Sequence, residues 1–165
     1  MQETTLVRPY VQRADEGRAL WLLGKLATVK AGGSGTRDRL TVLESVSPPA
    51  FARPMHRRPN EDELFYILSG TATYHCHGES FQAGPGDFVF LPAGLAHTFT
   101  VGPDKPLRKL QITTPSGFEQ FAAAVGEPAS ERRLPDSGPV DATALDRAAA
   151  RHAIEILAQP TSTDP

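Results

Sequence analysis

Short runs of β-branched and aromatic residues, separated by glycine and proline, extend from about residue 20 to residue 114 of this chain. The 165 residues include 14 glycines and 15 prolines, and both residue types mark turns and strand ends. Many short strands with regular turn signals are typical of an all-β barrel or sandwich. The segments expected to form strands are 20–31, 38–47, 62–79, 87–102 and 107–115, with the first two joined by a loop at 32–36.

Helical spacing is confined to the C-terminal part of the chain. Apolar residues recur at 118, 121, 122 and 125, and Gly126 ends that pattern, which predicts a helix. Residues 127–139 are polar and rich in proline, and we expect an irregular connector there. A second helix is expected to begin with Asp141 as its N-cap and to lead into a short apolar run. We therefore divide the chain into a β-barrel with an N-terminal strand extension, 1–114, and a helical tail, 115–165, that packs on it.

Composition narrows the function to small-molecule chemistry. A net charge of -2 and a pI near 6.2 provide no basic surface, so nucleic acid and anionic membranes are not expected partners. No run of apolar residues is long enough to span a membrane. A single cysteine excludes an internal disulfide, and no secretory signal pattern is visible. We expect a cytoplasmic protein whose partner is a small-molecule ligand or substrate.

Two histidines and a glutamate are the candidate metal ligands. His56 and Glu63 come from one stretch, PMHRRPNEDELFYILSG, and His97 from a second, GDFVFLPAGLAH. If two hairpins bring these side chains together at the mouth of a barrel, they provide the minimum ligand set for a divalent transition metal with open coordination positions. By strand alternation Glu63 shares a face with Phe65 and Ile67, a costly place for a carboxylate unless a cation or a hydrogen bond compensates it.

These two stretches resemble the two sequence motifs of the cupin superfamily. His56, Glu63 and Gly70 fit the first motif; Gly86, Pro92, Gly94 and His97 fit the second. The resemblance covers about residues 40–114 and is closest to small bacterial single-domain cupins of the quercetin dioxygenase-like type. It implies a double-stranded β-helix (jelly-roll) barrel with peripheral C-terminal helices, and a homodimer. It also implies a divalent transition metal, iron, nickel, manganese or zinc, with Glu63 as ligand and catalytic proton acceptor.

Arg58 stands where the family has its second histidine. A guanidinium stays protonated and cannot donate a lone pair to a metal. Three interpretations remain open. Arg58 turns aside and the remaining three ligands bind a metal, in a dioxygenase acting on an aromatic, phenolic or polyketide-like substrate. Alternatively Arg58 pairs with Glu63 and contacts an anionic or phenolic ligand in a metal-free isomerase, cyclase or binding protein. In the third, the pocket has decayed and the barrel is a structural module.

Several aromatic residues belong to the same inferred inward face of the barrel. Phe65, Tyr74 and Phe99 are the side chains we expect at the wall of a ligand cavity, beside the ligand-binding Arg58. Arg53 and Arg57 add positive charge close to His56, which favours an anionic ligand.

The motif YHCH at 74–77 offers a second set of metal-binding side chains. Strand alternation predicts Cys76 inward and both His75 and His77 outward, as surface side chains beside a turn. The alternative is that one of these histidines replaces the missing ligand. Glu61 and Asp62 are expected to be solvated loop charges.

Overall fold

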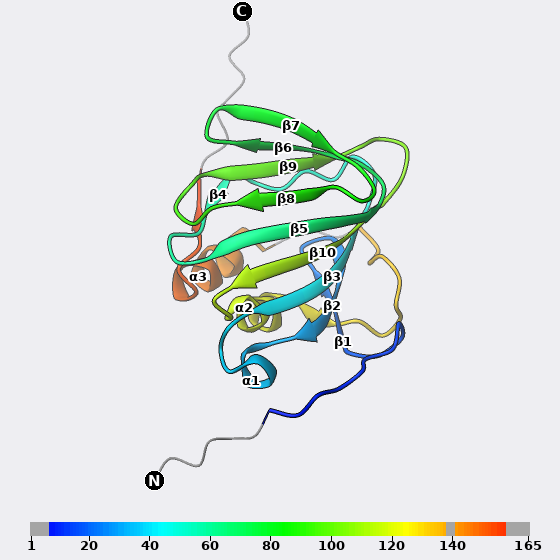
Figure 1. The fold of residues 1–165 in the computed structure, drawn as a ribbon. Coiled ribbons are helices and arrows are strands. Elements are labelled where there is room, and N and C mark those ends of the chain that lie inside the picture. The colour runs from blue at the N-terminus through cyan, green and yellow to red at the C-terminus, as the bar shows by residue number, and fades with distance from the viewer. Residues whose placement is uncertain (1–6, 138–140, 158–165) are drawn as a thin grey trace, which may run out of the picture.

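Two antiparallel sheets facing each other make up the body of the molecule (Figure 1). The computed structural model describes residues 7–137 and 141–157. The larger sheet has the order β11-β1-β2-β3-β10-β5-β8 and the smaller one β12-β4-β9-β6-β7. The strands are β1 Arg18–Leu22, β2 Lys25–Ala31, β3 Thr41–Ser47, β4 His56–Arg57, β5 Asp62–Ser69, β6 Ala72–Cys76, β7 Glu79–Ala83, β8 Phe88–Leu91, β9 His97–Val101, β10 Leu107–Thr114, β11 Glu127–Pro128 and β12 Glu155–Ile156. This is the expected mostly β, jelly-roll type of fold.

The N-terminal segments depart from the prediction in two places. The segment 20–31 contributes to a hairpin of two strands, β1 and β2, which pair antiparallel on either side of Gly24. The segment 32–36, expected as a loop, contains a single helical turn, α1 Gly33–Thr36, which ends at Arg37 in the left-handed conformation. Glycine-rich sequence gives little helix propensity, so this turn depends on contacts elsewhere, including the hydrogen bond from Gly33 N to Glu119 Oε1.

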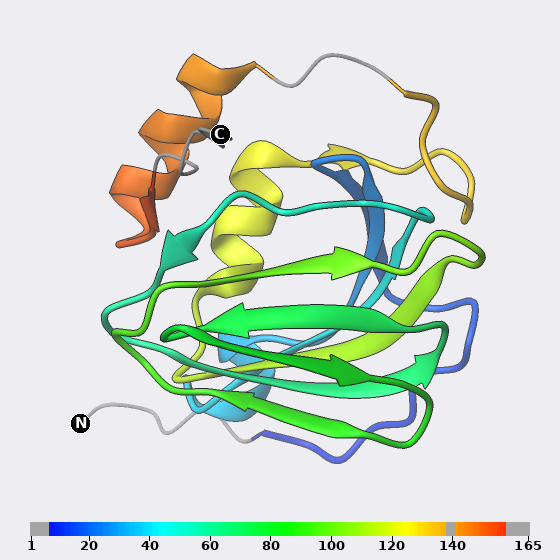
Figure 2. The same ribbon diagram turned by 90° about the horizontal axis from the view of Figure 1, so that it is seen from above.

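The two C-terminal helices form where the sequence pattern predicts them. Helix α2, Phe118–Val125, is followed by Gly126, and helix α3, Ala142–Arg151, begins after Asp141, whose side chain accepts a hydrogen bond from Ala144 N. Helix α2 packs against β1 and β3, and α3 packs against α2 and β12; both helices lie together on one side of the sheets (Figure 2). None of the helices described is long and apolar enough to cross a membrane.

The connector between these helices is irregular for most of its length. Its first residues form the short strand β11 beside β1, and residues 138–139 lie outside the described part of the chain. The division of the chain at residue 114 stays a prediction.

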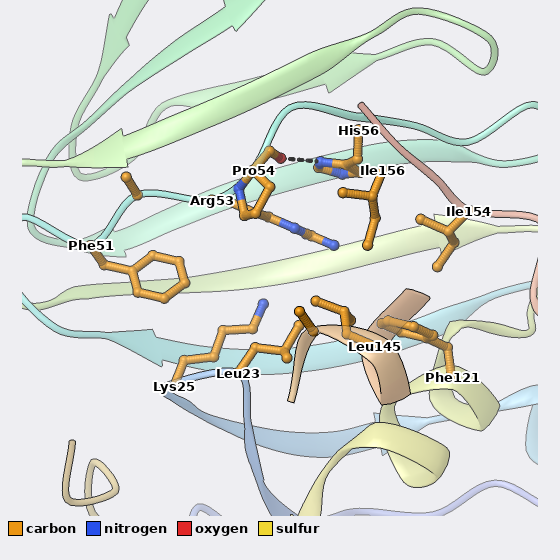
Figure 3. A pocket seen from close by; sticks show the side chains of 12 residues that line it. Leu23, Lys25, Phe51, Arg53, Pro54, His56, Phe121, Leu145, Ile154 and Ile156 are labelled. Carbon is orange, nitrogen blue, oxygen red and sulfur yellow. Dashed lines mark hydrogen bonds between the residues drawn. The ribbon is translucent and has the colours of Figure 1, made fainter. Parts of the chain in front are cut away.

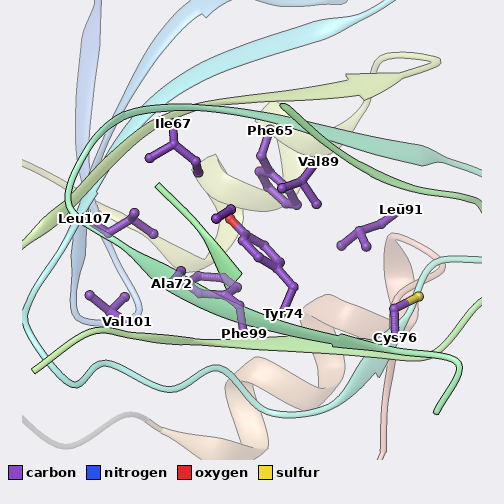
Figure 4. Close-up of a cluster of buried hydrophobic side chains, with 11 residues drawn as sticks. Phe65, Ile67, Ala72, Tyr74, Cys76, Val89, Leu91, Phe99, Val101 and Leu107 are labelled. Atoms are coloured by element: carbon purple, nitrogen blue, oxygen red, sulfur yellow. The ribbon is translucent and has the colours of Figure 1, made fainter. Parts of the chain in front are cut away.

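Strand alternation builds two apolar clusters. One fills the space between the two sheets and centres on Phe65, Tyr74 and Phe99, whose rings pack together in Figure 4. The other lies between the larger sheet and the helices and includes Phe118 and Phe121 of α2. The described residues also include buried polar and charged side chains, among them His56, Glu63 and His97.

Candidate metal centre and adjoining cavity

Three strands bring the predicted ligands to one buried point. His56 of β4 and His97 of β9 are directly opposite each other in the smaller sheet, and Glu63 comes from β5 of the larger sheet. All three side chains are almost fully buried, and their ligand atoms lie within 4.8 Å of one another. The spacing of the two sequence motifs therefore predicted a real cluster.

Backbone carbonyls fix the orientation of both imidazole rings. Nδ1 of His56 lies 3.0 Å from the Pro54 carbonyl oxygen, and Nδ1 of His97 lies 3.0 Å from that of Leu95. Because a carbonyl can only accept, each Nδ1 carries the proton and donates it. In the neutral rings both Nε2 lone pairs then face Glu63 Oε2, which lies 3.6 Å from His56 Nε2 and in closer contact with His97 Nε2.

The two Nε2 atoms and the Glu63 carboxylate oxygen are all hydrogen-bond acceptors, and in the part of the chain that the structure describes no N–H or O–H group lies among them to donate. Within the described residues His56 Nε2 is buried and has no hydrogen-bond partner, and His97 Nε2 meets a carboxylate oxygen that is itself an acceptor. A shared cation resolves both contacts, and in ligating histidines the N–H of the other ring nitrogen commonly donates to a backbone carbonyl in this way. The donor set therefore fits a divalent transition metal held by two imidazoles and one carboxylate.

Arg58 points inward and pairs with the opposite side of the same carboxylate. Its Nη2 lies 3.3 Å from Glu63 Oε1, and Gln111 Nε2 donates to that oxygen at 3.3 Å. The guanidinium carbon also lies 4.1 Å from the centre of the Phe118 ring. Arg58 thus leaves Oε2 to the histidines, although its positive charge lies close to any metal bound there and weakens binding by repulsion.

Glu61 is the second partner of Arg58 and corrects one expectation. It is half-buried rather than a solvated loop charge, and Glu61 Oε2 accepts from Arg58 Nη1 at 3.2 Å. Asp62 likewise has a structural role, since its carboxylate accepts from Ala93 N at 2.8 Å. The sequence alone could not show this, because the turn at Pro59 decides which acidic side chain reaches the arginine.

The electrostatic environment keeps two of the candidate ligands, His56 and Glu63, in the protonation states that a metal requires. Burial, with the nearby Arg53 charge, lowers the pKa of His56 to about 3, so its imidazole is neutral near pH 7. Burial raises the pKa of Glu63, but the charges of Arg58 and Arg53 and the contacts with the two histidines hold that pKa well below its ordinary value. The carboxylate is therefore ionised.

A cavity of about 410 Å³ opens beside His56 (Figure 3). Its wall comes from the start of β2, the segment before β4, helices α2 and α3, and β12. The side chains that line it are mostly apolar, with three exceptions, Lys25, Arg53 and His56. This volume and composition are typical of a small-molecule site.

Two buried basic side chains, Lys25 and Arg53, line this cavity. Neither makes a side-chain hydrogen bond or an ion pair within the part of the chain that the structure describes. Lys25 is 2% exposed and Arg53 is 9% exposed, and both side chains extend toward the cavity in Figure 3. Sequence reasoning missed Lys25. It placed Arg53 in a positive cluster with Arg57 and Arg58 that favours an anionic ligand, but Arg57 is instead paired with Glu155. The sequence signal that could have revealed Lys25 is a lysine within an otherwise apolar strand segment, GKLATV at 24–29.

A third buried cation, Lys109, lies among the predicted cavity aromatics. Lys109 Nζ lies 3.9 Å from the centre of the Phe65 ring and 3.7 Å from that of Phe99, and it donates to Tyr74 Oη at 3.4 Å. None of these three aromatic residues is among those that line the cavity beside His56. Their role as ligand contacts stays a prediction.

The histidines of YHCH lie on the outer face, as predicted. His75 and His77 are exposed and Cys76 is buried. Neither histidine belongs to the cluster of metal-ligating side chains found in the described residues, so nothing in their placement supports replacement of the missing ligand.

Comparison with known proteins agrees with the geometry. Residues 42–113 match the cupin domain family. The chain is 30% identical over 121 residues to quercetin 2,3-dioxygenase of Bacillus subtilis, covering 73% of this chain and 35% of that protein. It is 31% identical over 51 residues to an oxalate-binding protein of Thermotoga maritima, covering 31% of this chain and 42% of that protein. The chain thus spans less than half the length of either relative.

Similarity to a solved structure extends the agreement to the fold. A predicted oxalate decarboxylase of Thermotoga maritima superposes with a TM-score of 0.58 at 19% identity, over 64% of this chain and 99% of that one. At this level of identity the match supports the barrel architecture alone.

Proposed function

Because this chain belongs to the cupin superfamily, with its cupin domain at residues 42–113, we propose that it is a metal-dependent dioxygenase acting on an aromatic, phenolic or polyketide-like small molecule. The observation that carries the proposal is the convergence of two oriented imidazole Nε2 atoms and one carboxylate oxygen on a buried point. The similarity to quercetin 2,3-dioxygenase supports the reaction type.

His56, Glu63 and His97 would hold the metal, which is iron, nickel, manganese or zinc. A bound ion of this kind would supply Lewis-acid chemistry at the open coordination positions, and the redox-active ions, iron, nickel and manganese, would supply dioxygen chemistry as well. Both atoms of O2 enter the organic product, so the substrate provides the electrons and no external reductant is required. The apolar cavity beside His56 receives the substrate and excludes water from the reacting groups.

The proposed roles of Glu63 are ligand and proton acceptor. Arg58 and Gln111 hold its Oε1, which leaves Oε2 directed at the histidines. The Arg58 charge also helps to keep the pKa of Glu63 well below the ordinary value, against the effect of burial, so Glu63 accepts a proton only weakly while Arg58 stays in contact. A substrate hydroxyl that draws Arg58 away would strengthen Glu63 as a base.

The first experiment is metal analysis by plasma mass spectrometry on protein purified without chelator. We expect about one transition metal per chain, lost in His97→Ala and retained in His75→Ala, a matched change of an exposed histidine on the same sheet. Oxygen uptake with flavonols and simpler phenols should follow the metal content. Absence of metal, even after reconstitution with all four ions, would refute the dioxygenase proposal.

The ion pair between Arg58 and Glu63 favours a second candidate function. With this pair at 3.3 Å the carboxylate is neutralised by a protein side chain, and the pocket would bind an anionic or phenolic ligand without metal, as an isomerase, a cyclase or a non-catalytic binding protein. A binder shows saturation without product, whereas a dioxygenase consumes O2 with turnover. Protein that stays metal-free yet binds such ligands would support this alternative.

We also propose that the chain forms a homodimer through aromatic residues on the outer face of the larger sheet. Tyr66 of β5 and Phe88 of β8 are opposite each other in the ladder and are 42% and 60% exposed, with Phe90 49% exposed on the same strand. Exposed apolar patches of this kind mark protein contacts. Sedimentation velocity should show a dimer that Phe88→Glu converts to a monomer, and a monomeric parent would contradict the proposal.

A further inference from the structure

We propose that the cavity beside His56 is a binding site for a hydrophobic monocarboxylic acid, whose carboxylate is held by Lys25 and Arg53 and whose apolar body lies against the C-terminal helices. This site deepens the proposed function by naming its substrate class, and it rests on that function only for the chemistry that follows binding. Two of its main contributors, Lys25 and helix α3, lie outside residues 42–113, the part that matches the cupin family.

The two cations are the first reason to assign an anion. A buried ammonium or guanidinium without a partner is costly, and proteins compensate such charges with carboxylates, phosphates or other acceptors. Neither Lys25 nor Arg53 has a side-chain hydrogen bond or an ion pair within the described residues, and both face the cavity (Figure 3). Their mutual repulsion adds to the cost, since the Arg53 charge is one cause of the lowered pKa of Lys25.

The cavity wall is the second reason, because no acidic side chain belongs to it. Every charged group among the lining residues is a cation. The carboxylate whose charge raises the pKa of both Lys25 and Arg53 is that of Glu63, which already contacts Arg58 and the two histidines. A ligand must therefore bring the negative charge.

The remaining wall sets the rest of the ligand. Phe51, Phe121, Leu145, Ile154 and Ile156 contribute apolar surface around the cations. A strongly hydrated dianion or a phosphate ester would leave this surface unused, whereas a carboxylate on an aromatic or alkyl body uses both parts. A cavity of about 410 Å³ is large enough for such a molecule.

The position of His56 connects this site to the metal centre. His56, Arg53 and Lys25 line one cavity, so a carboxylate held by the two cations lies beside a candidate metal ligand. The acid is thereby oriented with its apolar body toward α3 and its head group beside His56, the one predicted ligand among the residues that line the cavity. This is the placement that positions a substrate for reaction rather than storing it elsewhere on the protein.

The test is isothermal titration calorimetry of chelator-treated full-length protein with 1-naphthoate and octanoate, and with the neutral 1-naphthalenemethanol. We expect saturable binding of both acids and binding of the alcohol weaker by about tenfold or more, because a charge-assisted pair is lost. Equal binding of acid and alcohol would reduce the cavity to an apolar site and overturn the proposal. Absence of binding by either acid would overturn it as well.

Variants separate the charge from the cavity itself. Lys25→Met should weaken naphthoate binding by about tenfold or more without loss of folding, since it exchanges an unpaired buried charge for an apolar chain of similar length. Leu145→Trp, which fills the cavity from α3, should weaken both acids without changing any charge. Lys105→Met, the same substitution at an exposed loop position, should leave binding unchanged. Unchanged binding in both Lys25→Met and Leu145→Trp would place the acid elsewhere and refute the site.

Metal analysis keeps the two proposals distinct. Naphthoate binding to metal-free protein with a failed metal reconstitution would refute the dioxygenase and support the acid site. Normal metal loading with no binding of either acid would refute the acid site and support the dioxygenase. Lys25→Met should retain the metal content of the parent, because Lys25 is not one of the three predicted ligands.

Discussion

Two buried lysines, Lys109 and Lys25, have opposite surroundings in this molecule. Lys109 is fully enclosed between the sheets, over the rings of Phe65 and Phe99 and within hydrogen-bond distance of Tyr74. Lys25 is nearly as buried, but it faces a cavity and has no such partners within the described residues. The protein itself provides the partners of Lys109 Nζ, whereas the side chain of Lys25 is open to a ligand in the cavity.

The difference teaches how to separate a structural cation from a functional one. Burial lowers the pKa of both lysines, that of Lys25 to about 7 and that of Lys109 well below its ordinary value, so burial alone does not distinguish them. What distinguishes Lys25 from Lys109 is that it faces a cavity and has no hydrogen-bond partner within the described residues. Arg58 is intermediate, since Glu61 and Glu63 neutralise it while it still touches the candidate metal centre.

The largest expected effect concerns stability. Lys109→Ala should lower the free energy of unfolding by about 2–5 kcal/mol, because it leaves a void between packed aromatic rings. Lys25→Ala should cost much less, since that side chain already borders a cavity. Urea unfolding measures both, and Lys109→Met, which preserves the packed stem, should recover most of the loss. Equal costs for the two alanine variants would remove the distinction between the lysines.

The next largest effect is on metal affinity when Arg58, the intermediate of the three buried cations, is replaced. Arg58→His restores the imidazole that the family motif contains and removes a cation beside the ligands, so metal affinity should rise by about tenfold to a hundredfold. Competition with a chromophoric chelator measures this change. Arg57→His is the matched control, because Arg57 is exposed and pairs with Glu155, and it should leave the affinity unaltered. A similar gain in both variants would show that Arg58 does not border the centre.

The smallest effect is the pH dependence of acid binding. A carboxylate prefers protonated Lys25, so affinity should be constant below pH 7 and weaken above it, by at most about tenfold per pH unit. Three charged groups act on Lys25: Arg53 and Arg58 lower its pKa and Glu63 raises it. His56, with its pKa near 3, stays neutral throughout. Calorimetry from pH 6 to pH 9 should show this decline in the parent and a flat profile in Lys25→Met; the same decline in both would assign it to another group.

Much of the fold was predictable because its signals are local. Strand alternation placed Phe65 and Tyr74 inward and His75 outward, and the Asp141 cap and Gly126 marked the helix ends. The helical turn at Gly33–Thr36 was not predictable, because contacts with α2 hold it. A short apolar run such as 20–31 also fails to show where a tight turn divides it into two strands.

The candidate metal centre was predictable in membership, since the spacing of His56, Glu63 and His97 placed all three on inward positions of paired strands. The sequence by itself determined these residues, the mostly β fold and the absence of a second histidine at Arg58. Only the tertiary structure decided that Arg58 pairs with Glu63 Oε1 and that Lys25 and Arg53 meet at a cavity lined in part by α3. The physical reason is that alternation fixes which face a side chain occupies, whereas partners and cavities depend on how distant segments pack, and no local pattern encodes that distance.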